Sequence, residues 1–492
     1  MLYSAGFLAA WPVVLFLVAE PVRDCGWSTL ADVLAARFGE RPVRIAAGTS
    51  SLTVSVLHLV ARMAGAGLLV PLLLGGESRA ARTWSVVGVG ALMVVHVPLG
   101  GMRATTWIQI VKSVLLMSGT ATLTVLVLLR SSGDFGRLLS TAAARSGHGL
   151  DFLAPGLSHG GDWTARLDFI SLGLALVLGT AGLPPLPPRH RADRARRPPV
   201  HGLGDRAHRR LPLTTIVIGF GAAALLGPEA VRSSNAAGNT AVPLLALGLG
   251  GGAGSTGGTV LSAVVAAVAF ATILAVVDGT TLASSASVAH DLHASLRRRE
   301  GAHRIGEVAV ARLAAAGTGV PAIGLSLLAR DLNVAFLVGL ASAVAASANP
   351  PVLLYTLFWR SFTTRGAVRA VYGGLVPAVL LVLVSPVESG SPASLLPGLD
   401  FQVFPLENPG LVSVPLGFAS GWLGTVTSRE KPDEERHAEA EVRSLTGAGA
   451  VRPGCGRRFT PPAPPRRPSA AASPASRRTT RGGAAATRPR PR

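Results

Sequence analysis

The chain has 492 residues, of which 49% are hydrophobic and only 15% charged, whereas an ordinary globular protein has about 25% charged residues. This composition excludes a chain that is disordered throughout, because disorder needs high charge and few apolar residues. Two cysteines, Cys25 and Cys455, are too few for a disulfide-built secreted domain. The net charge of +20 comes almost entirely from arginine, since Lys112 and Lys431 are the two lysines in the sequence.

Uncharged apolar runs of close to 20 residues recur along the chain and predict membrane-spanning helices. The runs do not alternate apolar and polar residues with a period of two, which argues against a β-barrel. Because lipid otherwise admits only helices, we predict an all-α polytopic bundle with about eleven spans. The approximate limits are 2–19, 45–75, 84–100, 105–129, 168–184, 211–228, 241–250 running into 258–289, 307–329, 332–357, 367–386 and 408–426.

Small residues are frequent inside these runs. MAGAGLLV, FGAAALLG and VAASANPP are examples. Small side chains let neighbouring helix backbones approach closely in a membrane, which favours tight helix packing. Locally unwound helices around a binding site are the alternative interpretation of the same runs.

Arginine is concentrated in alternate connections between the spans. Residues 23–44, 290–306 and 359–369 are rich in arginine, whereas 387–407 contains neither arginine nor lysine. Positive residues stay on the cytoplasmic side, so we predict a multi-pass protein in the lipid bilayer of the plasma membrane, with a cytoplasmic C-terminus. A soluble basic protein would suggest nucleic acid, but this pattern of charge predicts no nucleic-acid partner.

Seven motifs occur in order along the chain. They are GWSTLADVLAARFG, GGMRATTWIQIVKSVLLM, LDFISLGLALVLGTAGLP, FATILAVVDGTTLASSASVAHDL, ASANPPVLLYTLFWRSFTTRGA, FPLENPGLVSVPLGFASGWLG and EVRSLTGAGA. Together they resemble the sodium:solute symporter family, specifically its cation/acetate symporter branch. The resemblance covers roughly residues 1–183 and 211–450 and stays in register throughout.

The resemblance implies a LeuT-type fold of two inverted repeats, with a central site formed by discontinuous helices. It also implies secondary active transport, in which inward movement of sodium or another cation drives uptake of a short monocarboxylate such as acetate. Such a transporter needs no cofactor beyond the transported Na⁺. The sequence contains no HExxH, GxSxG or GxxxxGK[ST] motif, so we do not expect an enzyme.

The chain departs from the family in three places. The match begins within the region of the second core helix, so we expect the family's first helices to be missing. Residues 184–210 are rich in proline and arginine and cannot span lipid, so we interpret them as a cytoplasmic or out-of-frame segment. Beyond the family's cytoplasmic C-terminus at 429–450, the Pro-, Ser- and Arg-rich residues 451–492 predict a disordered basic tail.

These departures leave two alternatives open beside a transporter with core regions at 1–183 and 211–428. One is a truncated or frameshifted remnant that keeps the fold signals without transport. The other is a membrane scaffold or sensor that signals through its tail, although the composition of the tail argues against a structured partner-binding segment.

Candidate cation ligands are concentrated in the run 258–289. In the wider family this helix supplies hydroxyl ligands to sodium, which makes its hydroxyls and its carboxylate candidates by resemblance. A carboxylate within a span is also a functional hypothesis in its own right, because burying it is costly. Hydroxyls that bond their own helix backbone are the structural alternative. The candidates are Thr272, Asp278, Thr280, Thr281, Ser284 and Ser285.

Three further polar residues are candidates for the substrate pathway. Gln109 matches the acetate branch, with interfacial anchoring as its alternative role. Thr180 lies in GTAGLP, a break that exposes carbonyls or merely kinks the helix. Asn349 precedes two prolines and marks either a broken helix or a kink. Arg62 stands where the family tends to have glutamine; it either attracts a carboxylate or is a defect or a displaced side chain.

Overall fold

The computed structural model describes residues 2–19, 21–22, 29–74, 78–182, 200–235, 237–287, 307–389, 394–395, 398–431 and 433–446. Some helical stretches are described by their backbone alone, among them 93–106, 200–210, 278–279 and 282–287. The predicted tail at 451–492 and residues 184–199 of the predicted Pro/Arg-rich segment lie outside the described residues.

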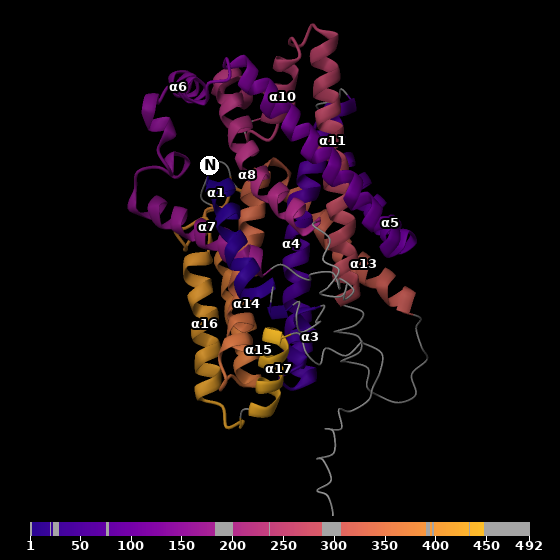
Figure 1. Cartoon of the computed structure of the whole chain (residues 1–492), viewed down its shortest axis with the longest axis vertical. Helices are drawn as coiled ribbons and strands as arrows, with labels where there is room; N and C mark the ends of the chain where they lie inside the picture. Colours follow the sequence, from indigo (N-terminus) through magenta and orange to yellow (C-terminus); the bar gives the residue numbers. More distant parts are fainter. Residues whose placement is uncertain are drawn as a thin grey trace, which may run out of the picture. The chain divides into compact units, whose positions relative to one another are not determined.

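Within the described residues every regular element is a helix, which confirms the predicted all-α class (Figure 1). Short π- and 3₁₀-helical turns lie at Val14–Ala19, Gly149–Leu153, Leu157–His159 and Ala329–Asp331. The α-helices are α1 (Leu2–Val13), α3 (Leu30–Ala35), α4 (Glu40–Leu74), α5 (Arg79–Arg130), α6 (Phe135–Arg145), α7 (Trp163–Ala181), α8 (Val200–Leu225), α9 (Pro228–Ser234), α10 (Ala241–Leu249), α11 (Thr256–Ser287), α13 (Glu307–Leu328), α14 (Val334–Phe358), α15 (Thr364–Leu383), α16 (Gly410–Val426) and α17 (Glu434–Thr446).

Eight helices in the described part of the chain are long and apolar enough to cross a membrane. A ninth span is possible if the bent pair Leu211–Leu225 and Pro228–Ser234 counts as one. The 97° bend of this pair lies at Gly227, whose φ of 82° suits glycine, and Pro228 then begins the next helix. The predicted span at 408–426 is the apolar helix α16, which is shorter, at 17 residues.

Helix α5 joins two segments that the sequence analysis separates. The runs 84–100 and 105–129 are predicted as separate spans, but the backbone is helical throughout the 52 residues of α5. A helix of that length is about 78 Å long, more than twice the roughly 30 Å thickness of the hydrocarbon core. Only the segment Trp107–Arg130 is apolar enough to count as a span.

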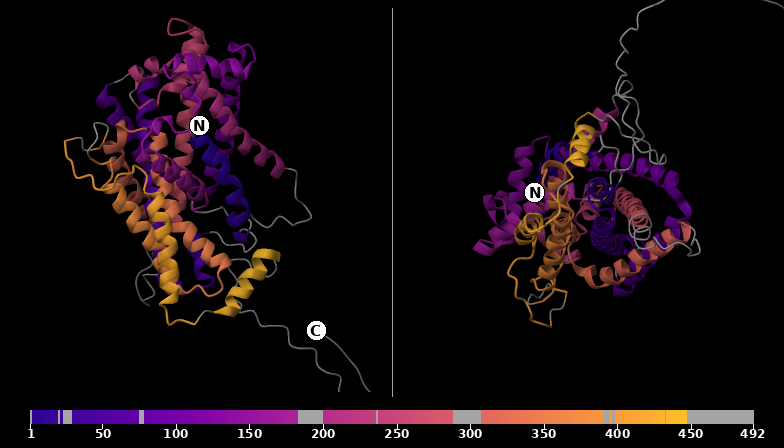
Figure 2. Two further views of the ribbon diagram at one scale, coloured as in Figure 1. Left: turned by 90° about the vertical axis from the view of Figure 1, so that its left-hand side faces the viewer. Right: turned by 90° about the horizontal axis from the view of Figure 1, so that it is seen from below.

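Helix α14 lies at the centre of the packing and contacts α4, α7, α15 and α16 (Figure 1; Figure 2). It stays helical through Pro350 and Pro351. Because proline has no N–H, Pro351 leaves the carbonyl of Ser347 without its intrahelical donor. Gly374 of α15 and Gly417 of α16 pack against this carbonyl so closely that a methyl group on either would overlap it. The three backbones therefore meet at a point that admits no side chain.

Glycine also brings α7 against α14. A methyl group at Gly179 would overlap the backbone of Ser342, and one at Gly182 would lie 2.7 Å from the carbonyl oxygen of Ala345. This close approach is the tight packing that the small-residue runs predict. It places the end of α7 beside the polar centre of α14.

Candidate functional site

Asn349 is a buried polar junction between three helices. Its exposed fraction is 2%. The side-chain oxygen accepts a hydrogen bond of 2.6 Å from the hydroxyl of Ser50 on α4, and the side-chain nitrogen donates to the carbonyl of Gly182 at the end of α7. Since α14 continues through the following prolines, the helix is not broken at Asn349.

Helix α7 ends where the GTAGLP motif predicts a break. Its last residue is Ala181, and Gly182 caps it. The Gly182 carbonyl is used by Asn349, so the break does expose a backbone oxygen to a polar partner. Thr180 instead donates its hydroxyl to the carbonyl of Leu176 within its own helix, at 2.8 Å. Asn349 therefore contacts the backbone of Gly182, two residues after Thr180, and not the Thr180 side chain.

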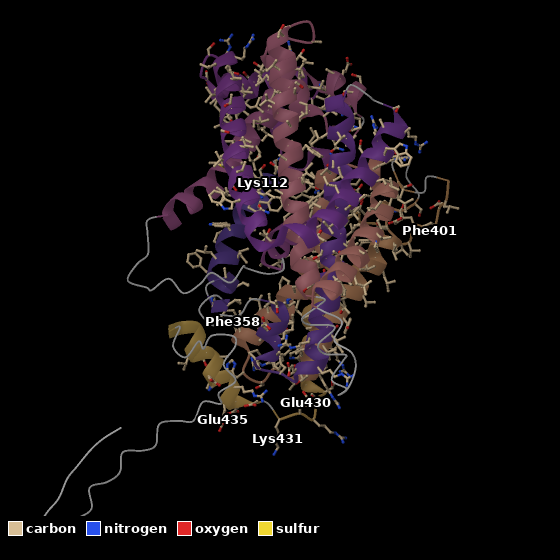
Figure 3. All side chains as sticks on the ribbon, turned by 90° about the vertical axis from the view of Figure 1, so that its right-hand side faces the viewer. Lys112, Phe358, Phe401, Glu430, Lys431 and Glu435 are labelled. Carbon is tan, nitrogen blue, oxygen red and sulfur yellow. The ribbon has the colours of Figure 1, made fainter. Side chains whose placement is uncertain are left out.

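Gln109 lies at a second polar junction, between α5 and α11. Its side-chain nitrogen donates to the carbonyl oxygen of Ala275 at 2.7 Å, and its side-chain oxygen accepts from the ammonium group of Lys112. The structure therefore places Gln109 against the helix that carries the predicted cation ligands. Lys112 lies well away from the end of the bundle that carries Glu430 and Lys431 (Figure 3).

The predicted hydroxyls of α11 bond their own helix. Thr272, Thr280 and Thr281 each donate to the carbonyl four residues earlier, at 2.7–2.9 Å. Thr281 is fully buried. Thr272 lies one turn from Ala275, which Gln109 contacts. The side chains of Asp278, Ser284 and Ser285 lie outside the described residues, although the α11 backbone includes their positions.

Arg62 lies on α4, a helix that contacts both α5 and α11. Its guanidinium donates to the carbonyl of His58 at 3.1 Å, one turn earlier in α4. Helices α4, α5 and α11 contact one another pairwise, so the cationic side chains of Arg62 and Lys112 lie among three packed helices.

Sequence reasoning missed a polar contact between α7 and the start of α16. The carboxylate of Asp168 accepts a hydrogen bond of 2.7 Å from the backbone N–H of Asn408, and the hydroxyl of Ser171 donates to the carbonyl of Asn408 at the same distance. His159 lies 3.9 Å from Asp168. The signal was present, because Asp168 is a carboxylate within an apolar run and Asn408 precedes Pro409, the N-cap residue of α16.

A second missed cluster lies where α3, α14, α15 and α17 meet, which we name the α17 end. Arg37 donates to the carbonyls of Thr356 at 2.6 Å and of Trp359 at 2.7 Å, and also to that of Arg360. Burial lowers the pKa of Arg37 to about 10, which leaves it charged at neutral pH. A recess of about 280 Å³ beside it is lined by Arg37, Phe38, Gly39, Phe362, Thr363, Thr364, Glu430, Lys431, Asp433 and Arg436.

The recess at the α17 end belongs to neither polar junction. It is lined by loop and helix-end residues, whereas the junctions of Asn349 and Gln109 lie inside spans. Among the described residues, no group of three or more His, Cys, Asp or Glu side chains is arranged to hold a metal ion. The candidate site residues predicted from the sequence thus lie at the two junctions and along α11, where Thr272 is one turn from the Gln109 contact.

Comparison with known proteins identifies the family. Residues 1–374 match the family described as "SSF: Sodium:solute symporter family". The chain is 45% identical over 468 residues to a protein of Corynebacterium glutamicum named "Monocarboxylic acid transporter", covering 92% of this chain and 83% of that one. It is 42% identical over 453 residues to "Uncharacterized symporter YwcA" of Bacillus subtilis, covering 90% and 84%.

A solved structure supports the LeuT-type fold. The substrate-bound outward-open state of a Na⁺-coupled sialic acid symporter superposes with a TM-score of 0.56 at 14% identity, covering 87% of this chain and 82% of that one. The fold is thus of the LeuT type, and the protein is a multi-pass membrane transporter of a solute rather than an enzyme. From the match to most of the chain and these two close relatives, we conclude that the chain belongs to the sodium:solute symporter family.

Proposed function

We propose that this chain takes up a short monocarboxylate, such as acetate, driven by inward movement of sodium across the bacterial inner membrane. The observation that carries the proposal is the 45% identity, over 92% of the chain, to a relative named "Monocarboxylic acid transporter". The C-terminus is assigned to the cytoplasm because arginine is concentrated in the loops on that side.

The α11 hydroxyls are the proposed cation ligands. A hydroxyl that donates its proton to a backbone carbonyl keeps two lone pairs, so the bond that Thr272 donates to Val268 is compatible with cation binding by its oxygen. Thr280 and Thr281 donate to their own helix in the same way. Oxygen is the ligand atom that a hard cation requires. The sequence adds Asp278, Ser284 and Ser285 on the same helix as further oxygen ligands.

The two polar junctions form the proposed substrate pathway. Gln109 joins α5 to α11 beside Thr272, and Asn349 joins α4, α14 and the end of α7 beside Thr180. These contacts hold helices that must move relative to one another when the site opens to either side. Sodium binds first and orders the site, the monocarboxylate binds next, and the loaded protein then opens inward.

Reconstituted full-length protein tests the proposal directly. Liposomes that contain the protein are given radiolabelled acetate or propionate under an inward Na⁺ gradient. Uptake is compared with uptake under an equal inward K⁺ gradient. We expect accumulation above equilibrium that requires Na⁺ and is abolished by a Na⁺ ionophore. Liposomes without protein measure the passive entry of the protonated acid.

The alternatives give different results in the same assay. Accumulation driven by a pH gradient and indifferent to Na⁺ would replace sodium with protons as the coupling ion. An absence of accumulation under any gradient, from protein that unfolds cooperatively on heating, would identify a folded remnant or scaffold and contradict the proposal.

A further inference from the structure

The hydroxyl of Ser55 on α4 is buried without a hydrogen-bond partner. Ser55 is 1% exposed and lies inside the span Glu40–Leu72. In the described part of the chain, the Ser55 Oγ and the His437 Nδ1 are the buried side-chain oxygen and nitrogen atoms that make no hydrogen bond. A buried hydroxyl in this state is costly, because it has given up its bonds to water and gained none in exchange.

Other buried hydroxyls in the described spans bond their own helix. Thr281 on α11, Thr318 on α13 and Thr356 on α14 each donate to the carbonyl four residues earlier, at 2.6–3.1 Å. This bond is the ordinary way for a membrane helix to satisfy a hydroxyl. The corresponding acceptor for Ser55 is the carbonyl of Ser51, and Ser55 does not bond it. The Ser55 hydroxyl therefore keeps both of its lone pairs for another partner.

Helices α4 and α11 run antiparallel where they pack together. A methyl group added at Gly65 of α4 would lie 3.4 Å from the Cδ1 of Ile273 on α11. Val277, one turn further along α11, belongs to the same buried cluster as Leu59 and Ala61 of α4. Residue numbers thus fall along α4 as they rise along α11. Figure 1 agrees, since α4 begins near α3 and α11 begins near α10, at opposite ends of the bundle.

This register brings Ser55 to the level of the predicted cation ligands of α11. Ser55 precedes Gly65 by ten residues, or about 15 Å along the helix axis. The same distance along α11 from Ile273 reaches the turn that follows the fully buried Thr281. The axes of packed helices lie about 8–10 Å apart, which is close enough for short side chains of both to bind one ion.

A small cation is the partner that this position suits. A hard cation such as sodium takes oxygen ligands, and a hydroxyl that makes no other bond can turn a lone pair toward it. Helices α4 and α11 both contact α13 as well, so an ion between them would be held within the bundle. Bound there, it would give the Ser55 oxygen the partner that the protein itself does not supply.

We propose that the Ser55 hydroxyl is a ligand of the transported sodium ion, supplied by α4 opposite the hydroxyls of α11. The proposal rests on the proposed function and deepens it, because it adds a second helix to the cation site. An ion shared by two helices stabilises the folded protein only while it is bound. Occupancy of the site is therefore measurable without transport.

Thermal unfolding of the full chain in detergent provides that measurement, with NaCl titrated against choline chloride at constant ionic strength. We expect Na⁺ to raise the unfolding temperature of the wild-type protein, and S55A to need at least tenfold more Na⁺ for half of that rise. In choline alone, S55A should unfold at the same temperature as wild type or higher, because it loses only an unpartnered hydroxyl. S55C, which replaces the oxygen with a soft sulfur of similar size, should lose the response to Na⁺ in the same way.

Ser342→Ala is the matched control. Ser342 is a buried serine of the span α14 whose hydroxyl already donates to the carbonyl of Val338. This variant should keep the wild-type response to Na⁺. A structural role for Ser55 makes the opposite prediction: S55A would unfold earlier in choline and respond to Na⁺ as wild type does. That result, or a wild-type protein whose unfolding is indifferent to Na⁺, would overturn the proposal.

Uptake of propionate by proteoliposomes provides the second measurement. S55A and S55C are each expected to raise the Na⁺ concentration for half-maximal uptake at least tenfold, with a smaller change in the KM for propionate at saturating Na⁺. A raised KM for propionate with unchanged Na⁺ dependence would assign Ser55 to the substrate and reject the proposal, while leaving the proposed function intact. Na⁺-dependent stability that requires Ser55, in a protein that drives no uptake, would instead reject the proposed function alone.

Discussion

Gln109 on α5 and Ala275 on α11 are joined by a 2.7 Å hydrogen bond from a side-chain amide to a main-chain carbonyl. The same amide group accepts from Lys112 through its oxygen, so one side chain both pins α5 to α11 and orients a cation. In lipid no water replaces such a bond when it breaks. Gln109 therefore connects the packing of the bundle to the chemistry of the site.

Replacing Gln109 with leucine removes the α5–α11 bond while keeping the side chain's bulk. We expect a loss of about 1 kcal/mol in the free energy of unfolding and slower uptake, because Lys112 loses its acceptor. Thermal unfolding in detergent measures the first and proteoliposome uptake the second. Thr122→Val is the control, because the exposed Thr122 donates only within α5. Equal losses in both variants would contradict a role specific to Gln109.

Replacing Asn349 with alanine leaves the Ser50 hydroxyl and the Gly182 carbonyl without their partner. Both groups are buried, so the expected loss is about 2–4 kcal/mol of stability. The fraction of monodisperse protein after heating in detergent is the measurement. Ser118→Ala, which removes an exposed hydroxyl bonded within its own helix, should leave that fraction unchanged. A stable Asn349→Ala protein would show that water or a shifted backbone satisfies these groups.

Replacing Gly374 with alanine forces α15 away from the Ser347 carbonyl. The added methyl group would overlap backbone atoms of α14, which cannot rotate aside, so we expect strong destabilisation or failure to accumulate in the membrane. Gly219→Ala is the matched control, since no atom lies within 4 Å of its added methyl group. Alanine there should raise stability by about 0.5–1 kcal/mol, because it favours the helix. Similar behaviour of the two variants would show that α14 and α15 do not pack this closely.

Acid should release α17 from the bundle. His437 on α17 is 4% exposed, and its Nδ1 has no hydrogen-bond partner among the described residues. Burial lowers the pKa of His437, Arg37 and Arg360 lower it further, and Glu441 opposes them. A histidine whose pKa is depressed in the docked state binds more protons when released. Docking is therefore fully stable above the ordinary pKa near 6.5 and weakens as pH falls below it.

Hydrogen exchange of residues 434–446 measures this release. We expect exchange to quicken between pH 7.5 and 5.5, after correction for the intrinsic rate, while α14 stays protected. His437→Gln removes the titrating group and should make exchange of α17 independent of pH. Exchange in the wild-type protein that does not change over this range would contradict the prediction.

Apolar run length was enough to predict the class of the fold and most of the spans. The helix α14 illustrates why, because its buried, uncharged sequence admits only a membrane helix or a core helix. The same reasoning did not predict that the runs 84–100 and 105–129 belong to one continuous helix, α5. Pro and Gly are weak predictors of breaks where neighbouring helices support the backbone.

The site was predictable only in part, because its contacts join residues far apart in the sequence. Gln109, Thr180 and Asn349 stood out as polar residues in apolar runs, but nothing local indicates that Asn349 meets Ser50, 299 positions away. Arg37 was not singled out at all. Arg37 lies in an arginine-rich segment. The local sequence does not distinguish an arginine that binds the carbonyls at a helix end from one that is exposed in a loop.

The bonds made by Arg37 have a consequence for how the molecule changes shape. They tie the segment between α3 and α4 to the last turn of α14, at Thr356, and to the two residues that follow α14, through one charged side chain. If those bonds persist throughout transport, α4 and α14 share a fixed pivot at that end, and their far ends swing through the larger arc. Replacement of Arg37 by a shorter donor would loosen the pivot and change which face of the protein is open at rest.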